Sequence, residues 1–225
     1  KIFKDINESK SLQALKKTLS QDKALADDKL MELVILKGLH DEFYDDNFSR
    51  SAMLEILDSL ISQTTIPEHK EIGINIRHKV TKLLTGYTPP DFQLYDNNNN
   101  LISLSDYVGK YVYLNFCSCQ SYACIQEFEA LEPLYERHKD KLQIITIVAD
   151  GTPEQMKEFL NKSGYPWKFV YYGNQPEVME NYDFRAFPTY YLIAPDGKLV
   201  LSPAPSPREN FENSLFNIMK SRGEI

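Results

Sequence analysis

The sequence predicts a mixed α/β domain, in which helices flank a central sheet, preceded by a small all-helical domain. Apolar residues recur at helical spacing from about residue 9 to residue 84, and alternating β-rich runs are absent there. The segment G-Y-T-P-P-D at 86–91 ends this periodicity, because its paired prolines cannot continue a helix. Strand-like runs then alternate with helical ones. We therefore expect two domains, at residues 1–86 and 87–225.

Three helices are expected in the first domain. The first, at 28–44, is apolar on more than one face, so it should be buried on several sides. The second covers 49–62, with Ser49 as its N-cap. The third begins near Pro67, which suits a first helical turn, and ends before Gly86. Its apolar face is expected to comprise Ile72, Ile76, Val80 and Leu83.

The second domain is expected to open with a hairpin through the asparagine-rich turn at 97–100. A strand at 111–116, a helix to about His138 and a second strand at 142–148 then predict a βαβ unit. The remaining elements are expected to be a helix at 153–162, a strand at 167–171, a hairpin of 189–193 with 198–201, and a final helix opened by the capping box at 206–209.

Composition and charge argue against several classes of function. Acidic residues outnumber basic ones by 32 to 25, which gives a formal net charge of −7, and the basic residues form no long block. Nucleic-acid binding is therefore not expected, because phosphates need clustered cations. No apolar run approaches the roughly 18 to 20 residues of a membrane helix. The chain begins at Lys1 without an apolar leader, so we expect a trimmed chain whose membrane attachment would require an N-terminal anchor outside this sequence.

The three cysteines, Cys117, Cys119 and Cys124, lie within eight residues of one another. Such clustering favours a local site over a disulfide framework. The histidines do not extend this cluster into a metal site, because neither their mutual spacing nor their spacing from the cysteines matches a zinc pattern. We therefore expect neither a metal nor a cofactor. The histidines concerned are His40, His69, His78 and His138.

Two motifs carry a resemblance to a known family. N-F at 115–116 ends a predicted strand, and after a short loop C-x-x-E at 124–127 opens a helix. Further along, F-P-T-Y-Y-L-I-A-P-D-G-K occupies 187–198. In this order, and with V-G-K-Y-V-Y-L-N-F at the front, the motifs resemble thioredoxin-like proteins of the TlpA/ResA class. The helical extension and S-P-A-P-S-P at 202–207 further resemble modular envelope redox proteins of Bacteroidetes-type bacteria.

The resemblance implies a thioredoxin fold in which Pro188 is a cis-proline that faces the redox site. It implies a polypeptide or thiol protein as partner, bound in a groove between Tyr122 and the Phe187-Pro188 pair by backbone pairing. It also implies a place in the periplasm or cell envelope, where disulfides persist. No cofactor follows from it.

The redox motif itself departs from the family pattern. The family places C-x-x-C at a helix start, because the helix N-terminus lowers the pKa of the first thiol and the second thiol resolves the mixed disulfide. The aligned residues here are S-Y-A-C at 121–124, so Ser121 takes the nucleophile position and Cys124 remains. A serine hydroxyl forms no disulfide. We therefore predict a protein of the thiol-disulfide oxidoreductase class whose ordinary dithiol exchange is weak or absent.

Three interpretations of the remaining thiols stay open. Cys124 could keep redox activity with Cys119 as its partner, provided that their Cα atoms lie within about 7 Å. All three thiols could instead be inert and buried, in a non-catalytic module that binds polypeptides. The S-x-x-C spacing also resembles the T/S-x-x-C of peroxiredoxins, which would make Cys124 the reactive thiol of a one-Cys peroxidase, although the motif's proline is missing and Arg185 is displaced.

Glu127 lies one helical turn after Cys124. In the resembled family a carboxylate near the dithiol moves protons, and this is the functional role that we consider for Glu127. The alternative is a favourable interaction of its negative charge with the helix N-terminus.

Overall fold

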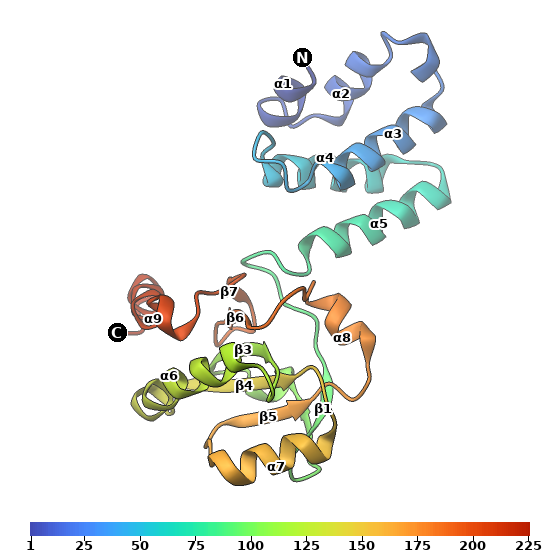
Figure 1. Cartoon of the computed structure of the whole chain (residues 1–225). Helices are drawn as coiled ribbons and strands as arrows, with labels where there is room; N and C mark the ends of the chain where they lie inside the picture. Colours follow the sequence, from blue (N-terminus) through green and yellow to red (C-terminus); the bar gives the residue numbers. More distant parts are fainter. The chain divides into compact units, whose positions relative to one another are not determined.

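The computed structural model describes all 225 residues, which form two compact units, Lys1–Thr81 and Lys82–Ile225 (Figure 1). The first unit is all-helical, as predicted. None of the helices in either unit combines the length and the apolar character that a membrane crossing requires. The helices of the first unit are α1 (Ile2–Asn7), α2 (Leu12–Leu19), the 3-10 turn η1 (Lys23–Leu25), α3 (Asp28–Asp41), α4 (Arg50–Gln63) and α5 (Pro67–Thr81).

Side-chain caps define where three of these helices begin. Ser11, Asp27 and Ser49 each accept a hydrogen bond from a backbone N–H two or three residues further on. Each cap satisfies an amide that has no partner inside the helix. The predicted cap at Ser49 is confirmed.

The apolar face predicted for the third helix is partly wrong. Ile72 is 38% exposed, and α5 ends at Thr81 rather than continuing toward Gly86. The helix packs through a small residue instead: a Cβ on Gly73 would lie only 2.7 Å from Cγ1 of Ile61. Apolar periodicity does not reveal a face made of small and polar residues. The buried residues of α5 are His69, Gly73, Val80 and Thr81.

A buried carboxylate connects several helices of the first unit. Glu32 on α3 accepts hydrogen bonds from Lys16 Nζ at 2.8 Å and from Thr64 Oγ1 at 2.7 Å. The Nδ1 atom of His69 lies 2.9 Å from the same carboxylate. Burial alone would raise the pKa of Glu32, but these hydrogen bonds outweigh burial and lower it to about 2. Glu32 therefore remains charged and ties α2 and α5 to α3.

The second unit contains a seven-stranded mixed sheet with the strand order β2-β1-β5-β4-β3-β6-β7. The predicted mixed sheet flanked by helices is confirmed. Strands β3, β4 and β5 run parallel, and the outer strands pair antiparallel. The strands are β1 (Gln93–Asp96), β2 (Leu101–Ser103), β3 (Tyr111–Cys117), β4 (Leu142–Val148), β5 (Lys168–Tyr171), β6 (Thr189–Ile193) and β7 (Leu199–Leu201).

Strand β3 lies between β4 and β6, and all seven of its residues are buried. Because side chains alternate along a strand, Tyr111, Tyr113 and Cys117 join the core that also contains side chains of α6, α7 and α9. Val112 and Phe116 join the core on the other face. The helices of this unit are η2 (Leu104–Tyr107), α6 (Tyr122–His138), α7 (Pro153–Ser163), α8 (Pro176–Asn181), η3 (Pro207–Glu209) and α9 (Phe211–Ser221).

Two elements of this unit differ from the prediction. Helix α8 was not predicted, because six residues are too short to display a helical period. The capping box at Ser206 and Glu209 opens the 3-10 turn η3 and not the final helix. Helix α9 begins afterwards, behind Asn210, whose φ of 72° breaks the helical path.

Candidate functional site

The three cysteines lie where β3 ends and α6 begins. Cys117 is the last residue of β3, and Cys124 lies in the first turn of α6. Between them, Ser121 is the N-cap of α6, with extended backbone dihedral angles. Its hydroxyl caps no backbone N–H, and lies close enough to Cys124 to help lower the pKa of that thiol. The strand end and the helix start thus bring these side chains together.

Cys124 has no exposed surface, yet its surroundings favour the thiolate. The backbone N–H of Ser118 donates a hydrogen bond to its Sγ at 3.2 Å. The neighbouring thiol of Cys117 has the largest influence on the pKa of Cys124, and the hydroxyl of Ser121 has a smaller one. Together these groups outweigh burial and lower the pKa of Cys124.

The pKa of Cys117 is shifted in the opposite direction. The Cys117 side chain also has no exposed surface, and burial, with a smaller contribution from the neighbouring Cys124, raises its pKa well above the usual value. Cys117 therefore stays protonated. Sequence reasoning missed the proximity of the two cysteines because it ended the strand at Phe116. The alternation of β3 would have revealed it, since Cys117 follows Tyr113 on the face that α6 covers.

Cys119, which we considered as the partner of Cys124, has different surroundings. Its side chain is half-buried, and burial, with a smaller contribution from the charge of Asp150, raises its pKa to about 12. Its interaction with Cys124 is one of charge alone. The thiol with the largest influence on the pKa of Cys124 is that of Cys117.

A recess of about 400 Å³ is lined by Glu127, Pro188 and Tyr190, among others, and by none of the cysteines. Two buried polar atoms on its wall have no hydrogen-bond partner: Oε2 of Glu127 and the hydroxyl of Tyr190. Burial raises the pKa of Glu127. Tyr190 is 3% exposed, and Cys117 and Cys124 lie close enough to influence its ionisation.

The residues expected to bind a polypeptide lie at the same end of the sheet. Thr189 pairs with Phe116, so the next step of this antiparallel register places Pro188 opposite Cys117. The Phe187-Pro188 peptide bond is cis, and both residues are half-buried. Tyr122, in the first turn of α6, is 74% exposed. Two large side chains, Tyr122 and Phe187, are thus available near the sulfur atoms.

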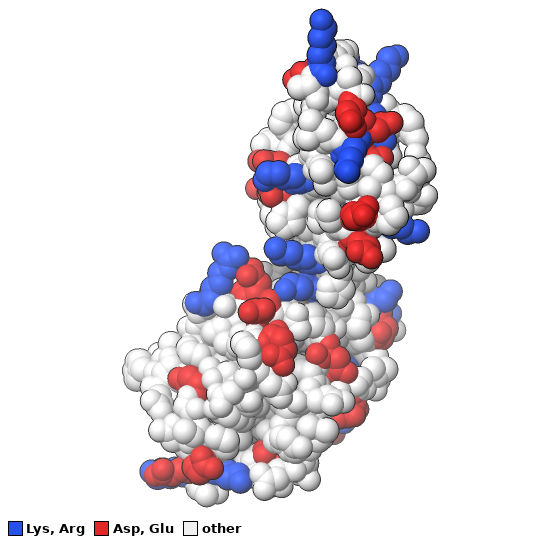
Figure 2. Space-filling view, turned by 90° about the vertical axis from the view of Figure 1, so that its right-hand side faces the viewer, with Lys and Arg blue, Asp and Glu red and all other residues white.

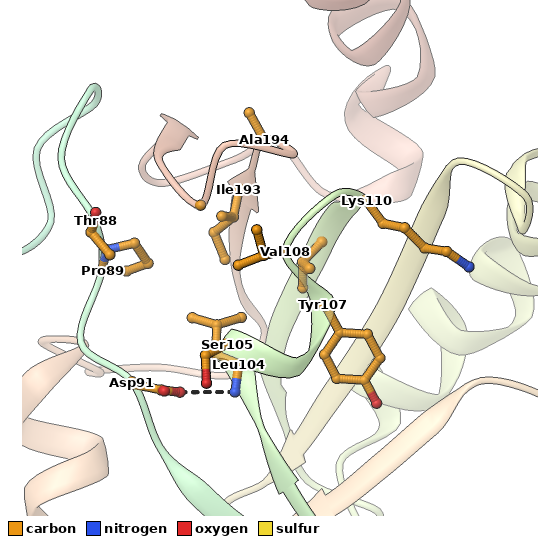
Figure 3. A pocket seen from close by; sticks show the side chains of 12 residues that line it. Thr88, Pro89, Asp91, Leu104, Ser105, Tyr107, Val108, Lys110, Ile193 and Ala194 are labelled. Atoms are coloured by element: carbon orange, nitrogen blue, oxygen red, sulfur yellow. Dashed lines mark hydrogen bonds between the residues drawn. The ribbon is translucent and has the colours of Figure 1, made fainter.

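A second pocket, of about 100 Å³, is a separate feature at the opposite end of the sheet (Figure 3). Val112 and Ile193, which pair at the far end of β3 and β6, line it. The carboxylate of Asp91 accepts the backbone N–H of Leu104 at 2.8 Å, and Lys110 extends away from the other lining side chains (Figure 3). The Asp91 carboxylate is therefore engaged by the backbone of Leu104, and the rest of the pocket is mainly apolar. None of the three cysteines lines it.

Neither the surface charge nor the arrangement of potential metal ligands indicates another kind of site. On the face shown in Figure 2, acidic and basic side chains lie interspersed and form no extended basic surface. No group of three or more histidine, cysteine, aspartate or glutamate side chains is arranged to hold a metal ion. The thiols, Glu127 and the surface around Pro188 therefore remain the candidate site.

Comparison with known proteins gives matches that centre on the second unit. Residues 85–202 match the AhpC/TSA family. The thiol-disulfide oxidoreductase ResA of Bacillus thuringiensis subsp. konkukian is 33% identical over 124 residues, which are 54% of this chain and 70% of that protein. The ResA of Geobacillus kaustophilus is 30% identical over 171 residues, 75% of this chain and 94% of that protein.

Solved structures agree with these sequence matches. The thioredoxin domain of a thiol-disulfide oxidoreductase from Bacteroides vulgatus superimposes with a TM-score of 0.55 at 26% identity. The superposition covers 60% of this chain and 98% of that domain. The helical unit lies outside the residues that the family match covers.

Proposed function

Because this chain belongs to the AhpC/TSA family and is a thioredoxin-like protein of the TlpA/ResA type, we propose that it is a cell-envelope protein of the thiol-disulfide oxidoreductase class that has lost ordinary dithiol exchange. The observation that carries this proposal is Ser121 at the N-cap of α6, where the family pattern places the attacking thiol. A place in the cell envelope is supported by the similarity to ResA.

Dithiol exchange begins with a thiolate that attacks a substrate disulfide and forms a mixed disulfide. The hydroxyl of Ser121 cannot form that bond. Cys124 has a lowered pKa, but its buried sulfur cannot reach the sulfur of a folded protein partner. The first step of ordinary exchange is therefore blocked at both positions.

The first expected result concerns catalysis. The wild-type chain should reduce insulin disulfides with dithiothreitol no faster than dithiothreitol alone, because no exposed low-pKa thiol is present to begin exchange. The turbidity of precipitating insulin measures the rate, and Cys124→Ser is the control that should match the wild type. A clear rate enhancement that disappears in Cys124→Ser would disprove the proposed loss of exchange.

The polypeptide-binding part of the proposal concerns the surface formed by Tyr122, Phe187 and Pro188. Tyr122 offers an exposed ring, and Pro188 lies directly before the edge of β6 near the thiols. Thioredoxin-like proteins can hold an extended chain beside such a strand by main-chain hydrogen bonds. A polypeptide or thiol protein is thus the partner class that we propose.

Replacing Pro188 by alanine is expected to weaken the binding of a reduced and alkylated polypeptide about tenfold, because the proline ring forms one wall of this surface. Isothermal titration calorimetry with alkylated insulin B chain measures the affinity. Pro195→Ala is the matched control, since Pro195 lies at the opposite end of β6 and should leave binding unchanged. Equal affinities of the wild type and Pro188→Ala would rule out the groove.

A second candidate function is peroxide reduction at Cys124. One contact favours it: the Ser118 N–H donates a hydrogen bond to the Cys124 sulfur, which stabilises a thiolate in the first turn of a helix. A thiolate that is buried but stabilised suits an oxidant much smaller than a protein.

A further inference from the structure

We propose that a recess at the end of β5 binds a carbohydrate, through an exposed tyrosine ring and a set of side-chain amides. The recess has a volume of about 370 Å³, within the range of about 300 to 1,000 Å³ that is usual for small-molecule sites. It lies between the end of β1, the first turns of α7 and the turn that follows β5 (Figure 1). No cysteine lines it, and neither does any residue of the polypeptide surface proposed above.

The side-chain amides around the recess are each held by the protein at one end. Asn174 accepts the hydroxyl of Tyr172 on its Oδ1 at 2.8 Å, and Asn99 accepts Nζ of Lys157 on its Oδ1 at 3.4 Å. Gln175 donates from its Nε2 to a backbone carbonyl of β1 at 3.5 Å. These contacts leave the NH₂ groups of both asparagines and the carbonyl of the glutamine for a ligand. Hydroxyl groups, which both donate and accept, match such a set.

The ring of Tyr95 adds an apolar surface to the recess. Tyr95 is 58% exposed, and its cross-strand partner Leu101 is 50% exposed on the same face of the β1–β2 hairpin. The buried side chains of Met156 and Tyr171 also line the recess. A sugar ring has C–H bonds on its faces and hydroxyls around its edge. It can therefore stack on the tyrosine while its hydroxyls reach the amides.

Charge and strand pairing argue against other ligands. The buried carboxylate of Asp96 is neutralised by Nζ of Lys168 at 3.0 Å. Lys157 is the other charged residue of the recess, and one cation does not favour a multiply charged ligand. A polypeptide cannot add a strand here, because β1 already pairs with β2 on one side and with β5 on the other. An uncharged ligand rich in hydroxyls is the chemistry that fits.

The test is a titration of the isotope-labelled full chain with neutral oligosaccharides, followed by two-dimensional amide NMR spectra. Maltotriose, cellotriose, mannotriose and chitotriose are added one at a time. We expect at least one of them to shift the side-chain amide signals of Asn99 and Asn174 and the backbone signal of Gly173. Tyr95→Ala should weaken the affinity for that saccharide about tenfold, because it removes the stacking ring. Tyr44→Ala is the matched control, since Tyr44 is 57% exposed in the helical unit, and should leave the affinity unchanged.

Three results would overturn the proposed carbohydrate site. The first is the absence of these shifts with every saccharide at millimolar concentration, and the second is an affinity that Tyr95→Ala leaves unchanged. The third is displacement of the saccharide by alkylated insulin B chain, which would assign the recess to polypeptides. The proposed polypeptide surface is tested separately: Tyr95→Ala should bind alkylated insulin B chain as the wild type does, because it leaves the surface around Pro188 intact.

Discussion

Replacing Ser121 by cysteine is expected to give this chain dithiol-exchange activity. The new thiol would stand at the N-cap of α6, where helix amides and the helix dipole lower a thiol pKa from about 8.5 toward 3.5 to 7.5. Cys124, three residues further on, would resolve the mixed disulfide. We expect Ser121→Cys to accelerate the reduction of insulin by dithiothreitol at least about tenfold over the wild type.

Two matched variants show whether the added sulfur is the cause. Ser121→Ala changes the same position without adding a thiol, so its rate should stay at that of dithiothreitol alone. Ser121→Cys combined with Cys124→Ser keeps the attacking thiol but lacks the resolving one, so it should accumulate a mixed disulfide without turnover. If Ser121→Cys were no faster than the wild type, the rest of the 117–124 loop would be the obstacle to exchange.

Replacing Glu32 by glutamine is expected to destabilise the helical unit by roughly 3 kcal/mol. This magnitude follows from the drop in the pKa of Glu32 to about 2, since each pKa unit corresponds to about 1.4 kcal/mol. The glutamine would leave Lys16, whose side chain is only 26% exposed, without its charged partner, and would disturb the contact with His69. Urea unfolding followed by far-ultraviolet circular dichroism measures the change.

Asp28→Asn is the matched control for this substitution. Asp28 also contacts Lys16, at 3.5 Å, but its side chain is 79% exposed. Removing an exposed charge of this kind should cost less than about 1 kcal/mol. Equal destabilisation by the two variants would show that burial of Glu32 contributes nothing beyond an exposed ion pair.

The carboxylate of Glu32 also makes the stability of the helical unit depend on pH. Because the folded-state pKa of Glu32 is below its unfolded value of 4.5, its contribution is complete above about pH 4.5 and is lost as the pH falls toward 2. The wild-type helical unit should therefore lose stability over this interval more steeply than Glu32→Gln. Parallel stability curves for the two proteins would contradict the assigned role.

The fold was predictable where a pattern is long or chemically distinctive. The run at 142–148 predicted β4, and the proline-rich break separated helical from alternating periodicity. The buried face of α5 was not predictable in this way, since Gly73 and His69 carry no apolar signal and depend on Ile61 and Glu32 of other helices. Local patterns cannot report such tertiary partners.

The residues of the candidate site also differ in whether the sequence alone could identify them. Alignment to the family pattern located Ser121 and Cys124 from sequence alone, and their roles remain predictions. The proximity of Cys117 and Cys124 was missed because the predicted strand ended at Phe116, although the alternation of β3 places Cys117 on the face that α6 covers. The unpaired hydroxyl of Tyr190 was equally hidden, since an aromatic residue on a strand suggests packing.

The aromatic cluster around Trp167 makes the second unit separately observable. Trp167 is the only tryptophan of the chain, is 5% exposed, and donates its indole N–H to Thr146 Oγ1 at 3.0 Å. Its ring stacks on Tyr165 with centroids 4.8 Å apart. Its fluorescence emission therefore reports the α/β unit alone, whereas far-ultraviolet circular dichroism records both units. A denaturation series followed by both signals would show directly whether the helical unit unfolds on its own.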